Sequence, residues 1–238
     1  RILYAIEKTV SDVTTKILLV LDGCIDGSRD IALAFCANTD LDTEIIETPD
    51  VWETIANNQG MKLVKTELVT IVQDDMLFFE HQWDMKLANV IHTHGASGVT
   101  GRSGCLVSFD EDGLFLPVDD IGRDHPFGCT TVFGKIVARL LVVGERLSLW
   151  ERLHYFPLFG RWQYPVPRQY INRGPLMLCM DHATKLGFFD PEFAPFELDD
   201  ADYCLRASKC LDAKFFVFPV GYIELNGSKK TTKLSSER

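Results

Sequence analysis

The chain has 238 residues, of which 46% are hydrophobic, enough to bury the core of one large domain. Its formal net charge of −10 and its pI near 5.0 argue against a nucleic-acid partner, because proteins that bind phosphate backbones usually present a basic face. No apolar run reaches the roughly 20 residues that a membrane-spanning helix needs, so we expect no transmembrane segment.

Strands and helices are expected to alternate over the first hundred residues. Apolar residues at helical spacing predict a helix over residues 1–11, and short apolar runs between turn residues predict buried strands. Ser28 is the expected N-cap of the second helix, and Asp50 that of the third, with Glu53 as its reciprocal partner. The later elements in order are strand 16–21, helix 29–37, strand 44–47, a helix from 50 to about 65, strand 68–72 and helix 81–94. This alternation favours an α/β fold with a parallel sheet covered by helices.

The alternation of predicted strands and helices is interrupted between residues 95 and 173. Turn-rich segments surround a short strand expected at 105–109, and residues 135–173 then hold seven Lys or Arg against two Glu, together with many aromatic side chains. This basic, aromatic region is open to three interpretations: a helical hairpin with an aromatic core, a site for an anionic or sugar-bearing acceptor, or a peripheral membrane contact. Regular structure resumes with strand 176–180, helix 182–186 and strand 214–218, and the polar end at 229–238 is expected to be loose.

Two acidic clusters are the candidates for chemistry. Asp74 and Asp75 follow the predicted strand 68–72, where open α/β sheets bind ligands; alternatively they cap the next helix in a solvated loop. The second cluster, Asp199, Asp200 and Asp202, exceeds what capping a helix requires. Two separate carboxylate clusters suit two roles, one holding Mn²⁺ or Mg²⁺ against a diphosphate and the other taking a proton from a nucleophile.

The order of the motifs resembles the inverting glycosyltransferases of the GT-A fold, in particular the nucleotide-sugar transferases of family 2. The matching motifs are Val20–Ser28 with its two Asp-Gly pairs, Asn58-Gln59-Gly60, Gln73-Asp74-Asp75, Arg173-Gly174-Pro175, Gly187–Asp190 and Asp199–Arg206. The resemblance covers about residues 1–110 and 170–228. It implies one α/β domain over residues 1–238 of the GT-A, Rossmann-like type, with a mostly parallel central sheet flanked by helices. Residues 1–110 would bind the nucleotide sugar, and residues 111–228, with the inserted basic and aromatic region, would form the acceptor and catalytic half.

The resemblance also implies roles for individual residues. Asp200 would be the catalytic base with Asp199 beside it, and Asp75 with Glu224 would hold Mn²⁺ or Mg²⁺ on the diphosphate. The nucleotide sugar would be bound by residues of the other motifs, namely Asp22, Gly23, Asp26, Asn58, Gly60, Asp74, Arg173 and Gly174. The expected partners are a nucleotide-diphosphate sugar donor and a glycan or lipid-linked acceptor.

Three positions depart from the family pattern. Leu21 stands where the first of two aspartates is usual, Gln73 replaces the first acid of the D-x-D motif, and Glu224 stands where a histidine is common. The family's first strand is not found ahead of the first predicted helix, so we expect the sequence to be a fragment that lacks upstream residues. A nucleotidyltransferase of similar architecture and a degenerate, non-catalytic carbohydrate-binding or scaffold domain are the alternatives.

The seven cysteines are scattered through the chain and include no C-x-x-C pair. An odd number of cysteines without metal-site or disulfide spacing favours free thiols in a reducing compartment. We therefore expect a cytoplasmic location.

Overall fold

The computed structural model describes residues 1–11, 15–109, 115–122, 164–195 and 198–225. The basic and aromatic region at 135–173 is thus described only from residue 164 onward, and the end at 229–238 lies outside the described residues. Across the part that is described, no helix is long and apolar enough to cross a membrane.

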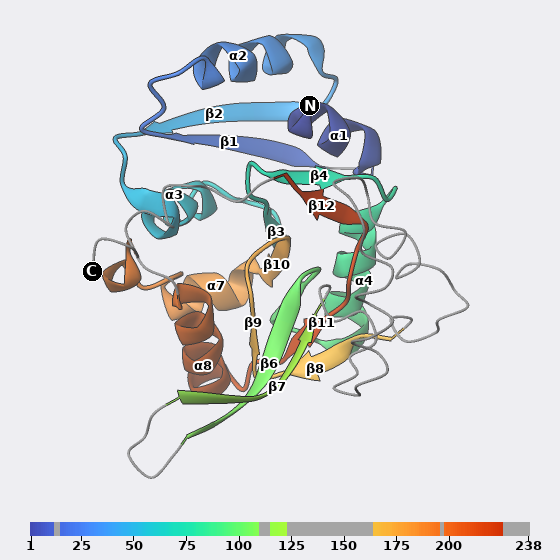
Figure 1. The fold of residues 1–238 in the computed structure, drawn as a ribbon, viewed down its shortest axis with the longest axis vertical. Coiled ribbons are helices and arrows are strands. Elements are labelled where there is room, and N and C mark those ends of the chain that lie inside the picture. Colours follow the sequence, from blue (N-terminus) through green and yellow to red (C-terminus); the bar gives the residue numbers. More distant parts are fainter. Residues whose placement is uncertain (12–14, 110–114, 123–163, 196–197, 226–238) are drawn as a thin grey trace, which may run out of the picture.

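Helices and strands alternate through the first half of the chain, as the sequence predicts, except that the short strand β4 follows β3 directly (Figure 1). The elements are α1 (Ile2–Thr9), β1 (Lys16–Asp22), α2 (Ser28–Asn38), β2 (Asp42–Thr48), α3 (Trp52–Met61), β3 (Leu68–Ile71), β4 (Met76–Phe78), α4 (Trp83–His94) and β5 (Gly98–Thr100). The second half supplies β6 (Ser103–Phe109), β7 (Phe115–Gly122), β8 (Val166–Arg168), β9 (Tyr170–Ile171), β10 (Leu176–Cys179), α7 (Met180–Leu186), the 3-10 turn η2 (Pro191–Phe193), α8 (Asp199–Leu211), β11 (Phe215–Val217) and β12 (Tyr222–Glu224).

A central sheet flanked by helices confirms the predicted α/β class, but the pairing of its strands differs from the prediction. The five-stranded sheet has the order β3-β10-β5-β11-β8, and only β11 and β5 pair in parallel. The expectation of a mostly parallel sheet was therefore wrong for these strands. The reason is that β10, from the second half of the chain, enters between β3 and β5 and runs against both of them, which the local alternation of elements does not reveal.

The parallel pairing that the sequence predicts is present in β1 and β2, which form a two-stranded sheet beneath α2 in Figure 1. Their register runs from Lys16 opposite Asp42 to Asp22 opposite Thr48. The carboxyl ends of both strands therefore meet at one edge, next to the start of α3.

Two predicted helix caps were wrong. The N-cap of α2 is Gly27, and Ser28 is already helical, with its backbone N–H donating to Oδ1 of Asp26 at 3.0 Å. The N-cap of α3 is Val51 without a side-chain hydrogen bond, and Asp50 before it has a positive φ of 51°. The Glu53 side chain contacts Gln73 and Arg173 instead, because these tertiary partners compete with the local capping geometry.

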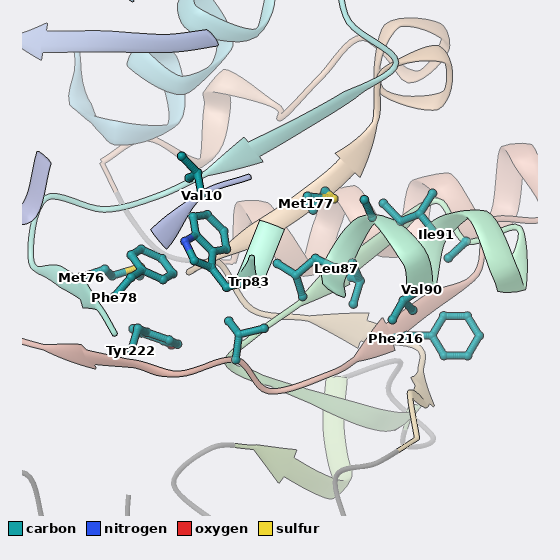
Figure 2. Packing of buried hydrophobic residues seen from close by; sticks show 14 residues of the cluster. Val10, Met76, Phe78, Trp83, Leu87, Val90, Ile91, Met177, Phe216 and Tyr222 are labelled. Atoms are coloured by element: carbon teal, nitrogen blue, oxygen red, sulfur yellow. The ribbon is translucent and has the colours of Figure 1, made fainter. Parts of the chain in front are cut away.

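The core consists of two clusters of buried side chains on either side of the central sheet. One is built around α4, where Trp83 stacks on Phe78 with a centroid distance of 4.0 Å and Leu87 is fully buried (Figure 2). The other joins α7 and α8 to β10 and β11 through Phe189 and Tyr203. Burial of each large aromatic side chain contributes roughly 1.5–3 kcal/mol, so the clusters hold the turns between these elements in place.

Candidate active site

Asp22, the predicted nucleotide contact, is the last residue of β1 and is held against the end of β2. Oδ1 of Asp22 accepts hydrogen bonds from Oγ1 of Thr48 at 2.6 Å and from the backbone N–H of Val51 at 2.7 Å. Gly23 has a φ of +57°, and a Cβ on it would lie 2.8 Å from the Cα of Asp50. Only glycine fits this turn without strain. The other carboxylate oxygen of Asp22, Oδ2, accepts no hydrogen bond from the described residues.

Asp26 lies at the exposed start of α2, in the same turn. Hydrogen bonds from the Ser28 side chain and backbone lower the pKa of Asp26 below its ordinary value. The structure thus places Asp22, Gly23 and Asp26 in one turn, as predicted.

The second predicted turn joins β3 to β4. The backbone N–H of Met76 donates to the carbonyl of Gln73 at 3.3 Å and closes the turn around Asp74 and Asp75. Asp74 is exposed, whereas Oδ1 of Asp75 is buried and has no hydrogen-bond partner among the described residues. The alternative of a capped loop before the next helix does not hold, because the short strand β4 follows the turn.

Glu224 is brought next to this turn by the pairing of β12 with β4. Its backbone is opposite Met76, and the N–H of Leu225 donates to the carbonyl of Asp75 at 2.7 Å. The two predicted metal ligands are therefore neighbours in space although they are far apart in the sequence. The side chain of Glu224 lies outside what the structure describes.

The buried, unpartnered Oδ1 of Asp75 fits a divalent cation, because an ionised oxygen out of water needs a positive partner. Within the described ranges, no three His, Cys, Asp or Glu side chains are grouped to hold a metal. Mg²⁺ in nucleotide sites is commonly held by one or two carboxylates together with substrate phosphates. The residues present fit a site of that type, in which Asp75 would be the main protein ligand.

The acidic cluster at the start of α8 contains one completely buried carboxylate. Asp199 is 0% exposed; its Oδ2 accepts from Oγ1 of Thr54 at 2.7 Å, and its Oδ1 lies 3.0 Å from Nη2 of Arg173. Oδ1 also accepts the backbone N–H of Asp200 at 2.9 Å. Both oxygens of Asp199 are therefore occupied within the protein.

Asp200 is half-buried, and its carboxylate is oriented by two backbone donors. Oδ2 accepts the N–H of Arg173 at 3.0 Å and Oδ1 accepts the N–H of Ala201 at 2.8 Å. Burial raises the pKa of Asp200, opposed by the Arg173 backbone hydrogen bond and charge. Asp202 pairs instead with Arg206 at 2.6 Å. Of these three aspartates, Asp200 has the arrangement of a general base.

Arg173 and Gly174 connect the two acidic clusters. Gly174 has a φ of +95°, and a Cβ on it would overlap the Met76 side chain and lie 3.2 Å from Oε1 of Gln73. The guanidinium of Arg173 reaches Asp199, as described above, and its Nη1 lies 3.4 Å from Oε1 of Glu53.

Glu53 joins these contacts, although the sequence predicts only a helix-capping role for it. Its Oε1 accepts from Nε2 of Gln73 at 3.0 Å in addition to its contact with Arg173. The sequence carries no signal for this role, because the spacing of Glu53 from Asp50 is that of an ordinary helix cap.

Asn58 and Gly60 make contacts within the protein. The side-chain amide of Asn58 donates to the carbonyl of Phe189 at 2.7 Å and accepts from its N–H at 3.1 Å. A Cβ on Gly60 would lie 3.1 Å from Cγ2 of Val20, so this glycine permits close packing of α3 on β1. Donor contacts by Asn58 and Gly60 stay predictions.

Residues 4–114, which include the turns at Asp22 and Asp75, match the model of the family described as glycosyl transferase family 2. The chain is family 2-like and has the GT-A fold. No curated protein sequence matches the chain at a significant level.

The family 2-like chain is similar in structure to solved glycosyltransferases. GalNAc-T7, in a crystal structure with UDP, GalNAc and Mn²⁺, has a TM-score of 0.59 at 12% identity, over 91% of this chain and 38% of GalNAc-T7. S. aureus TarS residues 1–349 give a TM-score of 0.53 at 12% identity, over 93% of this chain and 54% of that one. A longer TarS structure from S. aureus gives 0.54 at 13% identity, over 98% and 35% of the two chains. At these identities the likeness shows the fold, and the chain spans only part of the length of the proteins it matches.

Proposed function

We propose that this family 2-like chain transfers a sugar from a nucleotide-diphosphate sugar to an acceptor hydroxyl, with Asp200 as the general base. The observation that carries the proposal is the half-buried Asp200 carboxylate, which two backbone N–H groups orient and whose pKa burial raises. A carboxylate with a raised pKa is a stronger base than an ordinary aspartate.

In the proposed reaction, a carboxylate oxygen of Asp200 removes the proton of the acceptor hydroxyl while the hydroxyl oxygen attacks the anomeric carbon. The bond between that carbon and the diphosphate oxygen breaks, and the nucleoside diphosphate leaves with the bonding electron pair. Attack from the face opposite the leaving group in a single displacement inverts the configuration at the anomeric carbon.

The donor would lie beside the two predicted turns, one at Asp22–Asp26 and the other at Asp74–Asp75. Asp22, Gly23 and Asp26 would contact the nucleoside, and Asp75 with Glu224 would hold Mn²⁺ or Mg²⁺ beside the diphosphate. When bound, such a cation offsets the negative charge that grows on the leaving diphosphate. The presence of UDP and Mn²⁺ in the GalNAc-T7 structure supports a nucleotide-sugar donor and the use of a divalent metal.

A calorimetric titration with a panel of nucleotide-diphosphate sugars, with and without Mn²⁺, followed by an assay for sugar release, tests this proposal. Metal-dependent binding of one donor with release of its sugar is the expected result. Release of pyrophosphate from a nucleoside triphosphate and sugar phosphate would indicate a nucleotidyltransferase instead. Absence of binding to every donor would indicate a carbohydrate-binding or scaffold domain.

The acceptor and the location are further parts of the proposal. A glycan or a lipid-linked acceptor would approach Asp200, and residues 135–173 would provide acceptor or peripheral membrane contacts. The absence of paired cysteine motifs in the sequence supports a cytoplasmic location.

A further inference from the structure

The guanidinium of Arg173 is enclosed by two carboxylates from different helices. The Arg173 side chain is 12% exposed, Nη2 lies 3.0 Å from Asp199 on α8, and Nη1 lies 3.4 Å from Glu53 on α3. The contact with Glu53 is an ion pair rather than a hydrogen bond, because Nη1 has no acceptor with suitable geometry. Two carboxylates thus contact one guanidinium, and withdrawing the guanidinium to reach a phosphate would leave Asp199 buried with an unpaired charge.

Both carboxylates are themselves held. Gln73, at the end of β3, donates to Oε1 of Glu53 at 3.0 Å, and Thr54 donates to Oδ2 of Asp199 at 2.7 Å. The guanidinium therefore has fixed anchors on two helices and, through Gln73, on the turn that carries Asp75.

The backbone around Arg173 is held from both sides as well. Thr100 donates to the carbonyl of Asn172 at 2.8 Å, and the hydroxyl of Tyr222 donates to the carbonyl of Gly174 at 2.7 Å. Between these two bonds, the N–H of Arg173 donates to Oδ2 of Asp200 at 3.0 Å. One residue thus places an oriented donor on Asp200 while its side chain ties α3 to α8.

We propose that Arg173, anchored by Glu53 and Asp199, is a positioning residue that orients the Asp200 carboxylate for proton transfer. In this assignment Arg173 does not bind the donor and Asp199 is an anchor rather than a second catalytic group. The proposal rests on the proposed function in one respect: it takes Asp200 to be the base that removes the proton of the acceptor.

The first test measures Asp200 without any substrate. Aspartate labelled with ¹³C at Cγ reports the titration of Asp200 by NMR, with Asp200→Asn to identify its resonance. The charged groups that bear on Asp200 are Arg173, which lowers its pKa, and Asp199, which raises it. In Arg173→Met the pKa of Asp200 is expected to rise, because the opposing positive charge is lost. Lys185→Met is the matched control, since it breaks the exposed 2.7 Å ion pair of α7 with Asp181, outside the site. An Asp200 pKa equal in Arg173→Met and the control would overturn the proposal.

The second test uses turnover with the donor found by the calorimetric panel. Arg173→Met and Glu53→Gln are expected to lower kcat by roughly 10- to 100-fold while KM for the donor changes less than about twofold, because misplacing a reacting group costs rate rather than binding. Arg173→Lys keeps the charge without the forked geometry and should recover part of kcat. If KM rises while kcat is retained, Arg173 binds the donor and the positioning role is wrong.

The two tests separate the two proposals. If the unmodified chain turns over no donor, the proposed function fails and the NMR titration alone decides whether Arg173 sets the state of Asp200. If a thermal melt shows that Arg173→Met does not fold, the NMR titration and the turnover assay are made on Arg173→Lys and Glu53→Gln instead. A normal kcat in both of these variants would overturn the positioning role.

Discussion

Asn58 and Phe189, 131 positions apart in the sequence, are joined by two hydrogen bonds between the Asn58 amide and the Phe189 backbone. The bonds are buried and clamp α3 to the turn between α7 and η2. Because Thr54 and Glu53 lie one turn earlier on the same helix, this clamp also sets the distance between α3 and the acidic start of α8.

Replacing Asn58 by alanine should lower the free energy of unfolding by about 2–4 kcal/mol, because a buried N–H and a buried C=O lose their partners. Chemical denaturation of the variant measures the change. Asn38→Ala, which removes an exposed hydrogen bond within α2, is the control and should cost less than about 1 kcal/mol. Equal stability of the two variants would show that the clamp contributes nothing.

Gly23→Ala should destabilise the chain by at least about 2 kcal/mol. A side chain at φ +57° is strained by about 1–2 kcal/mol, and its Cβ would in addition press on Asp50. Gly27→Ala is the matched control, because nothing lies within 4 Å of a Cβ there. A thermal melt compares the two; similar melting temperatures would contradict the close approach of the turn to Asp50.

Asp200→Asn should lower transfer at least about 100-fold while leaving donor affinity nearly unchanged, because it removes the base and little of the binding surface. Initial rates and calorimetric donor titrations measure the two effects. Retained turnover in this variant would exclude Asp200 as the base.

The pH dependence of the unmodified chain should reflect the raised pKa of Asp200. The acidic limb of kcat/KM is expected above the ordinary value of 3.8, since the carboxylate must be ionised to accept a proton. The contribution of Asp200 to the free energy of unfolding should change in the opposite sense, because the folded state favours the protonated carboxyl. This stabilising contribution is complete below pH 3.8 and is lost as the pH rises through the pKa of Asp200 in the folded state. Unfolding at several pH values, compared with Asp200→Asn, measures the difference; an acidic limb at or below 3.8 would contradict the cause assigned to the shift.

Asp75→Asn should abolish the stabilisation that Mn²⁺ with UDP gives the unmodified chain. A ligand at 100 times its Kd stabilises the folded state by about 2.7 kcal/mol, and this gain requires the carboxylate that holds the ion. Thermal melts with and without Mn²⁺ and UDP measure it. Asp74→Asn, on an exposed neighbour, should retain the gain, and loss in Asp74→Asn alone would move the metal to that residue.

Local patterns predicted most of the elements but not the order of the central sheet. The apolar runs of β1 and β3 and the helical spacing of α4 indicate their type directly, since burial selects residues with the period of the element. Where β10 would insert, and in which direction, depends on contacts across more than 70 positions, as in the pairing of Leu176 with Thr100. No sequence window contains that information.

The sequence by itself determined the two acidic clusters and the similarity to family 2. Carboxylates at the ends of strands and at the starts of helices, and the glycines in the motifs, are visible as local patterns. Only the tertiary structure decided which carboxylate is enclosed by side-chain partners and which is not. Asp199 and Asp200 are adjacent and chemically identical, yet Asp199 is fully enclosed by Arg173 and Thr54, while Asp200 is half-buried and oriented by backbone donors. The difference arises from partners on α3 and the loop before β10, whose approach depends on packing of distant segments rather than on the residues next to the aspartates.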